Sequence, residues 1–220
     1  TDPYDLTVLR PEDIIFTNTL SPFTNLSYYK TFDSRNGEER FKSYFAINAN
    51  KRFGVGFYID YLYGRGLYAS QSTAFFNGGL FASYRGDKYN MHFIFNNDNL
   101  KMAENGGIAD DRYITNPLDM AEGKKEYKSY DIPTNLNKVW NHNTSYHVFM
   151  TQRYNLGFHK EKTDSVTKDS VRIIQEFVPV TSFIHTLQVD LNGRKYISYD
   201  DEQNQKYFEH NYLGNDSIDK

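Results

Sequence analysis

The chain has 220 residues, which is enough for one large β domain or two small ones. It contains no cysteine, and this excludes a disulfide scaffold, a thiolate metal site and a cysteine nucleophile. The formal net charge of −3 is small and evenly spread, which argues against a nucleic-acid-binding protein.

Hydropathy and aromatic content narrow the class further. The mean hydropathy is −0.72, and no run of about 18 apolar residues occurs, so a transmembrane helix is excluded. The absence of such a run does not exclude an outer-membrane β-barrel, because only alternate residues of its strands face lipid. Aromatic residues make up 17% of the chain, which suits β-strands and the aromatic girdles of such barrels. A tyrosine-rich soluble β protein has the same composition and stays open.

The first part of the chain predicts little regular structure. Residues 1–21 are interrupted by prolines, and Pro11 to Asp13 favours a short turn. Ile14 to Phe16 is a short apolar run, typical of an edge strand or of a plug, meaning a segment that fills a barrel. A first strand is expected from Pro22 to Phe32, followed by a loop over Asp33 to Gly37.

The stretch from Glu39 to Asn97 predicts four strands. Large apolar or aromatic residues occur at every second position, the period of a pleated strand, whereas a helix would place them three and four apart. The stripes are Phe41, Phe45, Ile47 and Ala49; Phe53, Val55, Phe57, Ile59, Tyr61 and Tyr63; Ala74, Phe76, Leu80, Ala82 and Tyr84; and Tyr89, Met91, Phe93 and Phe95.

The opposite face of these strands is small and polar but nearly free of Lys and Glu. Charges lie mainly in the connections. One apolar and one uncharged polar face suit a transmembrane barrel with lipid outside and a polar lumen. A lipocalin-like barrel would instead turn the apolar face inward, and the alternation does not decide between them. The polar face comprises Ser43, Tyr44, Asn48, Gly54, Gly56, Tyr58, Asp60, Thr73, Asn77, Gly79, Asn90, His92 and Asn96.

The connections alternate between long and short, as in outer-membrane barrels with short periplasmic turns and long external loops. We therefore predict that the short turns lie at one end of the sheet and the long loops at the other. The long connection over residues 98–138 is expected to be extracellular and to tolerate insertion near Gly123. The short turns are Asn50–Arg52 and Arg85–Asp87, and the other long loops are Asp33–Glu38 and Gly64–Ala69.

Beyond this loop, a sixth strand is expected from Trp140 to Leu156 and a polar turn from Glu161 to Ser170. Strand character returns over Val171 to Val178 and Thr181 to Tyr199, with Pro179 marking an edge, bend or bulge. Asn192-Gly193 fits a bulge within one long strand or, less favoured, a hairpin turn. Residues 200–220 read as a loop.

About seven membrane-length strands result. Bacterial single-chain barrels have an even number, and an open edge is not viable in lipid. We therefore predict an all-β, antiparallel, up-and-down transmembrane β-barrel, of which residues 1–220 form one partial domain.

No catalytic, cofactor or metal site is predicted, so the protein is not expected to be an enzyme. The histidines lack metal-binding spacing, and no nucleophile elbow occurs. Asn97 to Asn99 with Asp110 and Asp111 offers oxygen ligands for Ca²⁺, but a solvated loop explains it better.

The alternation instead predicts pore-lining residues. Asp60 is a mid-strand charge, and it either favours cations in a pore or pairs with Arg or Lys of a neighbouring strand. The pore-lining candidates are Tyr44, Asn48, Tyr58, Asp60, Asn77, His92, Asn96 and His147.

Several stretches together resemble the putative porins of Bacteroidetes, a family of outer-membrane β-barrel proteins. The resemblance covers most of the chain, and it implies a Gram-negative outer membrane, a pore-forming role, no catalytic residues and a longer full-length chain. The stretches are Thr1 to Asp5, Ser21 to Tyr28, Ala103 to Ile108, Val178 to Leu187, and Tyr196 to Tyr199.

Three functions follow from this reading. The first is a porin for passive diffusion of small hydrophilic solutes, in contact with outer-membrane lipid. The second is a plugged barrel that serves as a structural or assembly component and binds other outer-membrane proteins. The third is a soluble β-rich binding protein.

Overall fold

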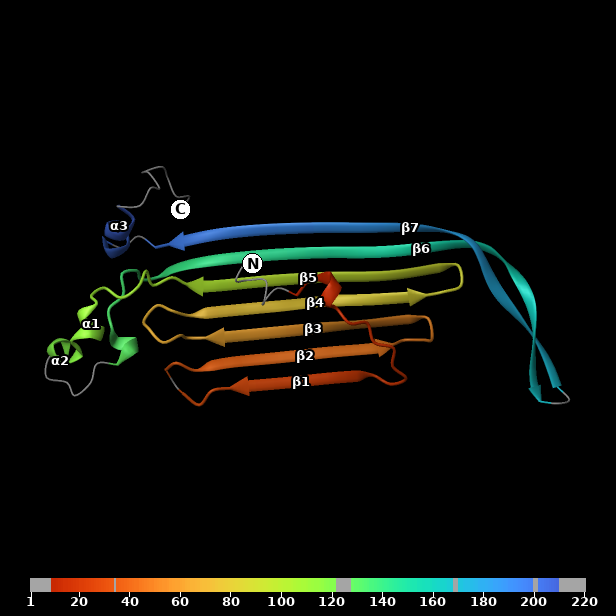
Figure 1. The fold of residues 1–220 in the computed structure, drawn as a ribbon, viewed down its shortest axis with the longest axis horizontal. Helices are drawn as coiled ribbons and strands as arrows, with labels where there is room; N and C mark the ends of the chain where they lie inside the picture. The colour runs from red at the N-terminus through yellow and green to blue at the C-terminus, as the bar shows by residue number, and fades with distance from the viewer. Residues whose placement is uncertain (1–8, 34, 122–127, 168–169, 200–201, 210–220) are drawn as a thin grey trace.

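The computed structural model describes residues 9–33, 35–121, 128–167, 170–199 and 202–209 (Figure 1). Its centre is one antiparallel sheet of seven strands, in which sequence neighbours pair throughout. This is the up-and-down topology predicted from the sequence. The strands are β1 (Phe23–Lys30), β2 (Glu38–Asn48), β3 (Phe53–Gly64), β4 (Thr73–Arg85), β5 (Tyr89–Ala103), β6 (Val139–Thr167) and β7 (Ser170–Ser198).

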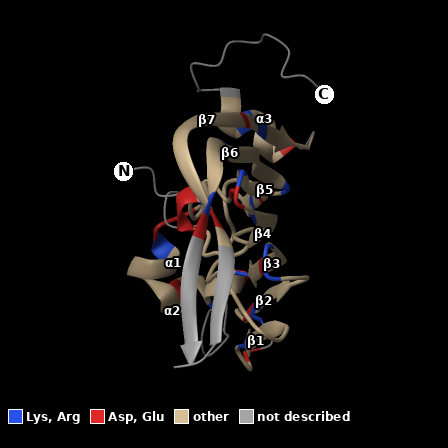
Figure 2. Cartoon of the chain, turned by 90° about the vertical axis from the view of Figure 1, so that its right-hand side faces the viewer, with Lys and Arg blue, Asp and Glu red and all other residues tan. Residues whose placement is uncertain are grey.

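The register joins the alternating residues of each strand into two continuous faces. Residues that pair directly project to the same side of a sheet. Tyr58 pairs with Tyr44 and Gly79, whereas its neighbour Phe57 pairs with Phe45 and Leu80. The sheet is curved, and the chain before β1 lies on its hollow side (Figure 2). We call the side that holds Tyr58 the concave face and the side that holds Phe57 the convex face.

The convex face is the apolar one. Within β2 to β5, every exposed large hydrophobic side chain lies on it, and no other described element covers them. The apolar stripes therefore face outward, the direction that the alternation left open. One assignment was wrong: Ser43 pairs with Leu26 and Ile59 on the convex face, because it is adjacent to Tyr44 and cannot share its side. The exposed residues are Phe41, Val55, Phe57, Tyr61 and Leu80.

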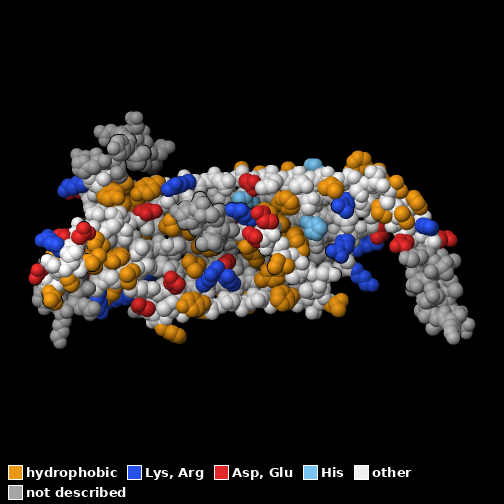
Figure 3. All heavy atoms as spheres, viewed as in Figure 1, with side chains coloured by type: hydrophobic (Ala, Val, Ile, Leu, Met, Phe, Trp, Pro, Cys, Tyr) orange, Lys and Arg blue, Asp and Glu red, His pale blue; other side chains and the backbone are white. Residues whose placement is uncertain are grey.

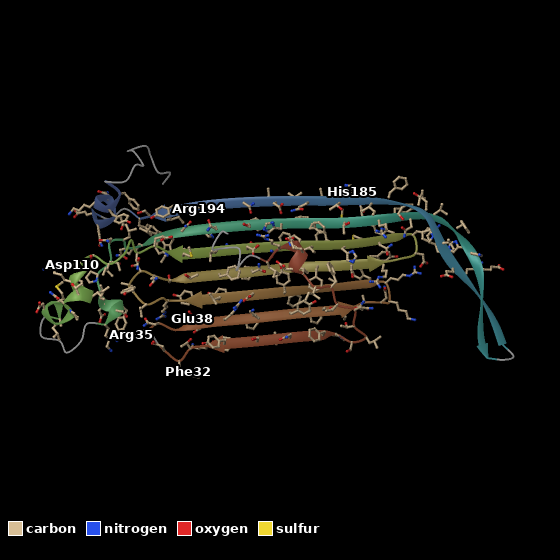
Figure 4. The ribbon with its side chains drawn as sticks, in the orientation of Figure 1. Phe32, Arg35, Glu38, Asp110, His185 and Arg194 are labelled. Carbon is tan, nitrogen blue, oxygen red and sulfur yellow. The ribbon has the colours of Figure 1, made fainter. Side chains whose placement is uncertain are left out.

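The connections are sorted by end, as predicted. The β2–β3 and β4–β5 turns lie side by side, since the Arg85 amide donates to the Arg52 carbonyl at 2.7 Å. The long connections lie at the other end, where Figure 4 shows Arg35 after β1 and Asp110 after β5. The cation–π contact of Arg35 with Tyr130, 4.5 Å from the ring centroid, joins two of these long connections.

The longest connection begins later than predicted. β5 continues to Ala103, so Asp98 lies in a strand and pairs with Asn77 and Ser145. Polar residues have low strand propensity, but pairing with strands on both sides overrides it here. The connection over 104–138 contains α1 (Arg112–Thr115), α2 (Pro117–Met120) and the 3-10 turn η3 (Ser129–Asp131). Gly123, the predicted insertion point, lies outside the described residues.

β6 and β7 form a hairpin that projects beyond the short-turn end of the sheet (Figure 1). Each strand has 29 residues. The turn predicted over Glu161 to Ser170 is therefore wrong for residues 161–167, which belong to β6, and for Ser170, which begins β7. Pro179 lies opposite Gly157 at a shift in register, as its lack of an N–H predicts. Asn192 and Gly193 pair in register with Ser145 and Thr144, which confirms one long strand there.

A helix follows β7 where a loop was expected. α3 (Glu202–Glu209) packs against the base of the 104–138 connection. The buried Asn204 side chain donates to the Asn137 carbonyl at 2.8 Å and accepts from the Asn137 amide at 3.1 Å. Among the described residues, no helix is long and apolar enough to cross a bilayer.

The chain before β1 crosses the concave face. Residues 9–20, which we call the N-terminal segment, contain only the 3-10 turn η2 (Pro11–Asp13). Leu9, Ile14 and Phe16 pack against a buried cluster on the sheet, so the edge strand expected as one alternative is wrong, and the plug stays a prediction. The cluster consists of Ala46, Tyr58, Phe81 and Ile94.

Candidate functional site: the concave face

Polar residues form two rows that run straight across the concave face. The rows are set by the register, since each member pairs directly with the next. Figure 3 views this face and shows charged and histidine side chains near its middle. The first row is Lys42, Asp60, Asn77, Asp98, Ser145 and Asn192, and the second is Tyr44, Tyr58, Gly79, Asn96, His147 and Asp190.

Asp60 is paired with basic side chains of the neighbouring strand β2. Arg40 donates to both carboxylate oxygens, with Nε–Oδ1 and Nη2–Oδ2 distances of 2.9 Å and 2.7 Å. Lys42 Nζ lies 3.5 Å from Oδ2. Of the two interpretations of Asp60, the cross-strand salt bridge is therefore the one the structure contains. The three groups together leave a net charge of +1 at this point of the face, since two cations meet one carboxylate.

Asp98 is the centre of a buried hydrogen-bond network. Asn77 donates through Nδ2 to one oxygen of Asp98, and Asn96 donates to the other at 3.0 Å. Tyr58 donates its hydroxyl to the side-chain oxygen Oδ1 of Asn96 at 2.7 Å. Burial of a carboxylate is costly unless donors surround it, and two strands provide these donors.

His147 lies between two carboxylates. Its Nδ1 is 2.6 Å from Asp190 Oδ1, and its Nε2 is 3.7 Å from Asp98 Oδ2. Gln188 donates to the second oxygen of Asp190 at 2.8 Å. The hydrogen bond between His147 and Asp190 extends the polar network from the sheet centre to its last strand.

The N-terminal segment is bound to the same rows. Asn96 Nδ2 donates to the carbonyl of Leu9 at 2.6 Å, and the amide of Leu9 donates to Asp98. Tyr44 donates its hydroxyl to the carbonyl of Ile15 at 2.9 Å, and Asn48 accepts from the amide of Thr19 at 2.9 Å. The concave face is thus a polar surface with a peptide lying on it.

All eight pore-lining candidates lie on the concave face. Four of them are in contact with the N-terminal segment: Tyr44, Asn48, Asn96 and His92. Tyr58 belongs to the buried cluster against which this segment packs. Tyr58 is only 8% exposed, so it supports the surface rather than facing open lumen. That this face lines a pore stays a prediction.

Sequence reasoning missed several residues of the face. Arg40, Lys42 and Asp190 have the alternation of the concave face, but they lie inside strands, where almost no charge was expected. Asp98 was placed in a loop. Phe81 and Ile94 lie on the concave face, between positions that are mostly polar. The apolar cluster that they form beneath Phe16 could be found only by assigning every residue of each strand to one of the two faces.

The site offers hydrogen bonding and charge rather than metal chemistry. Within the described part of the chain, no three His, Cys, Asp or Glu side chains converge as a metal site requires. Asn97 and Asn99 lie on the convex face and Asp98 on the concave face, so this run cannot surround one Ca²⁺ ion as a set.

Comparison with protein-family models gives one match, to a family described as "Putative porin", and it covers residues 1–220. Searches of curated proteins and of solved structures gave no match. Since the family match spans the whole chain, the chain belongs to this porin family.

Proposed function

We propose that the chain forms part of an outer-membrane β-barrel porin of a Gram-negative bacterium, which lets small hydrophilic solutes diffuse passively and performs no chemical reaction. The observation that carries the proposal is the exposure of aromatic and aliphatic side chains on the convex face. In water, an exposed apolar surface of this kind would promote aggregation. In a bilayer it is the lipid-facing band of a barrel.

The dimensions of the band support this proposal. The convex stripe of β3 runs from Phe53 to Tyr63, which are ten residue steps apart along one strand. At about 3.3 Å per residue and a tilt of about 40°, it spans roughly 25 Å, the height of the apolar band in outer-membrane barrels. Tyr84, Tyr89 and Tyr154 lie near its short-turn end, where an aromatic girdle is expected.

The sheet edges support membership of a larger barrel. Among the described strands, β1 and β7 each pair on one side only. An open strand edge leaves backbone groups without partners, which lipid does not tolerate. Further strands would therefore close the barrel, with the concave face as its lumen.

A second candidate is a plugged barrel that acts as a structural or assembly component. The N-terminal segment on the concave face favours it. So do residues 104–121 and 128–138, which with α3 form a cap at the long-loop end that could bind another outer-membrane protein. Ile114 and Leu118 are apolar and exposed on this cap.

Single-channel conductance of the full-length protein in planar bilayers tests the proposal. A porin gives stable conductance steps. A barrel that inserts, as shown by protease protection in the same vesicles, but gives no steps would contradict passive diffusion and favour the second candidate. Deletion of residues 1–20 provides a matched comparison, since removing a plug would raise the conductance of either barrel.

A further inference from the structure

The N-terminal segment is held through its backbone as well as its side chains. Two hydrogen bonds reach its side chains, Asn48 to Asn18 at 3.1 Å and Tyr44 with Thr17 at 3.5 Å. At Leu9 both the amide and the carbonyl are bound, by Asp98 and Asn96. The carbonyl of Ile15 and the amide of Thr19 are bound by Tyr44 and Asn48. Backbone amides and carbonyls occur in every peptide, so through these bonds the four side chains, which we call the anchors, recognise a peptide backbone.

The anchors are held in place by the sheet. Asn96 is fully buried at 0% exposure, and Tyr58 fixes its orientation. Asp98 is held by Asn77. Groups fixed by neighbouring strands lose little conformational freedom when they bind, which favours a site that exists before its ligand arrives.

One pocket adds selectivity. The ring of Phe16 meets the rings of Phe81 and His92 edge to face, with centroids 5.5 Å and 5.0 Å apart. Tyr44 stacks on Phe81, with ring centroids 5.5 Å apart, and extends this aromatic group. An aromatic side chain therefore fits directly after the carbonyl that Tyr44 binds.

We propose that the concave face is a binding site for peptides that contain an aromatic residue, and that the N-terminal segment is its resident, displaceable occupant. The anchors supply affinity through the backbone, and the pocket of Phe81, His92 and Tyr44 selects the aromatic residue. The proposal rests on the proposed porin function in one respect, that the face is open to a solute entering a lumen. Binding itself can be measured without conduction.

The direct test uses full-length protein that lacks residues 1–20, in detergent, and a fluorescent peptide with the sequence of residues 9–20. Fluorescence anisotropy should show saturable binding. Replacing the peptide residue that corresponds to Phe16 by Ala, or Asn96→Ala in the barrel, should weaken binding at least about tenfold. Asn143→Ala, on the concave face of β6, is the matched control and should leave affinity unchanged. No saturable binding, or equal affinity for Asn96→Ala, would overturn the proposal.

Hydrogen exchange in the intact protein covers the case in which the deletion prevents folding. The amides of Leu9 and Thr19 should exchange at least about tenfold more slowly than in the free peptide, and Asn96→Ala should accelerate the Leu9 amide. Exchange at the free-peptide rate would refute the site. If the barrel binds the peptide but never conducts, the porin function is refuted and the peptide site is supported. If it conducts but does not bind the peptide, only the peptide site is refuted.

Discussion

Arg52 and Asp87 are 35 residues apart in the sequence, yet Arg52 Nη2 lies 3.0 Å from Asp87 Oδ2. The pair joins the β2–β3 turn to the β4–β5 turn and places both at one end of the sheet. Both side chains are more than half exposed, so the pair contributes at most about 1 kcal/mol to stability. Its importance is topological, because it separates the short-turn end from the end with the long connections.

The two ends should lie on opposite sides of the outer membrane. The chain has no cysteine of its own, so Lys51→Cys and Leu118→Cys each introduce a single thiol into it. Both positions are exposed, and Leu118 is 81% exposed on the long-loop side. An impermeant maleimide added to intact cells should label Leu118→Cys, and Lys51→Cys only after the cells are opened. Labelling of both variants on intact cells would rule out this orientation.

The Arg40–Asp60 pair should influence the ion preference of the lumen. Asp60→Asn leaves Arg40 and Lys42 without their carboxylate, so the reversal potential in a salt gradient should shift toward anions. Arg40→Gln should shift it toward cations. A double-mutant cycle on stability should give a coupling of about 1 kcal/mol, because the pair is bidentate but partly exposed. Identical reversal potentials in all variants would place the pair away from the ion path.

Replacing Gly56 should destabilise the protein more than replacing Gly54, which lies on the same face of β3. A Cβ at position 56 would overlap the carbonyl oxygen of Phe45 and the ring of Phe81. At position 54 its nearest contact would be Ser83 Oγ at 3.3 Å. Gly56→Ala should lower the free energy of unfolding by about 1–3 kcal/mol and Gly54→Ala by about 0.5 kcal/mol or less. Urea titration of detergent-refolded protein measures both, and equal midpoints would be inconsistent with the close packing of Phe81.

Arginine should be tolerated on the concave face and not on the convex face. Phe57 lies in the middle of the convex stripe, where Arg costs about 2–4 kcal/mol at the bilayer midplane. Ser145 lies on the concave face in the row of Asp98, where Arg should cost about 1 kcal/mol or less. Folding yield into liposomes should therefore fall for Phe57→Arg and change little for Ser145→Arg. The reverse order would invert the assignment of the two faces.

The sequence predicted the strands of the sheet and the two faces because side-chain period depends only on local backbone geometry. The alternation around Phe57 is present in the sequence itself. It also assigned the concave candidates, including Asn96 and His147. The end of β5 was missed because Asp98 is a poor strand residue by itself, and only pairing with β4 and β6 keeps it in the sheet.

The relationships across the site depended on information that local patterns lack. Whether Asp60 pairs with Arg40 depends on the register between β2 and β3, which period alone leaves undetermined. The contact of Leu9 with Asn96 joins residues 87 apart in the chain. The helix α3 was missed because Asn204, which anchors it to Asn137, has a modest helix propensity and takes its stability from this tertiary contact.

The central claim is that Phe57 faces lipid, and a nitroxide spin label at this position tests it most directly. Phe57→Cys provides the attachment site, and Ser145→Cys provides the matched label on the concave face. In liposomes, the label at 57 should be highly accessible to oxygen, which dissolves in lipid, and poorly accessible to a water-soluble relaxation agent. The label at 145 should show the opposite preference. Low accessibility of residue 57 to both agents would mean that it is buried in protein, and would contradict the membrane assignment of the convex face.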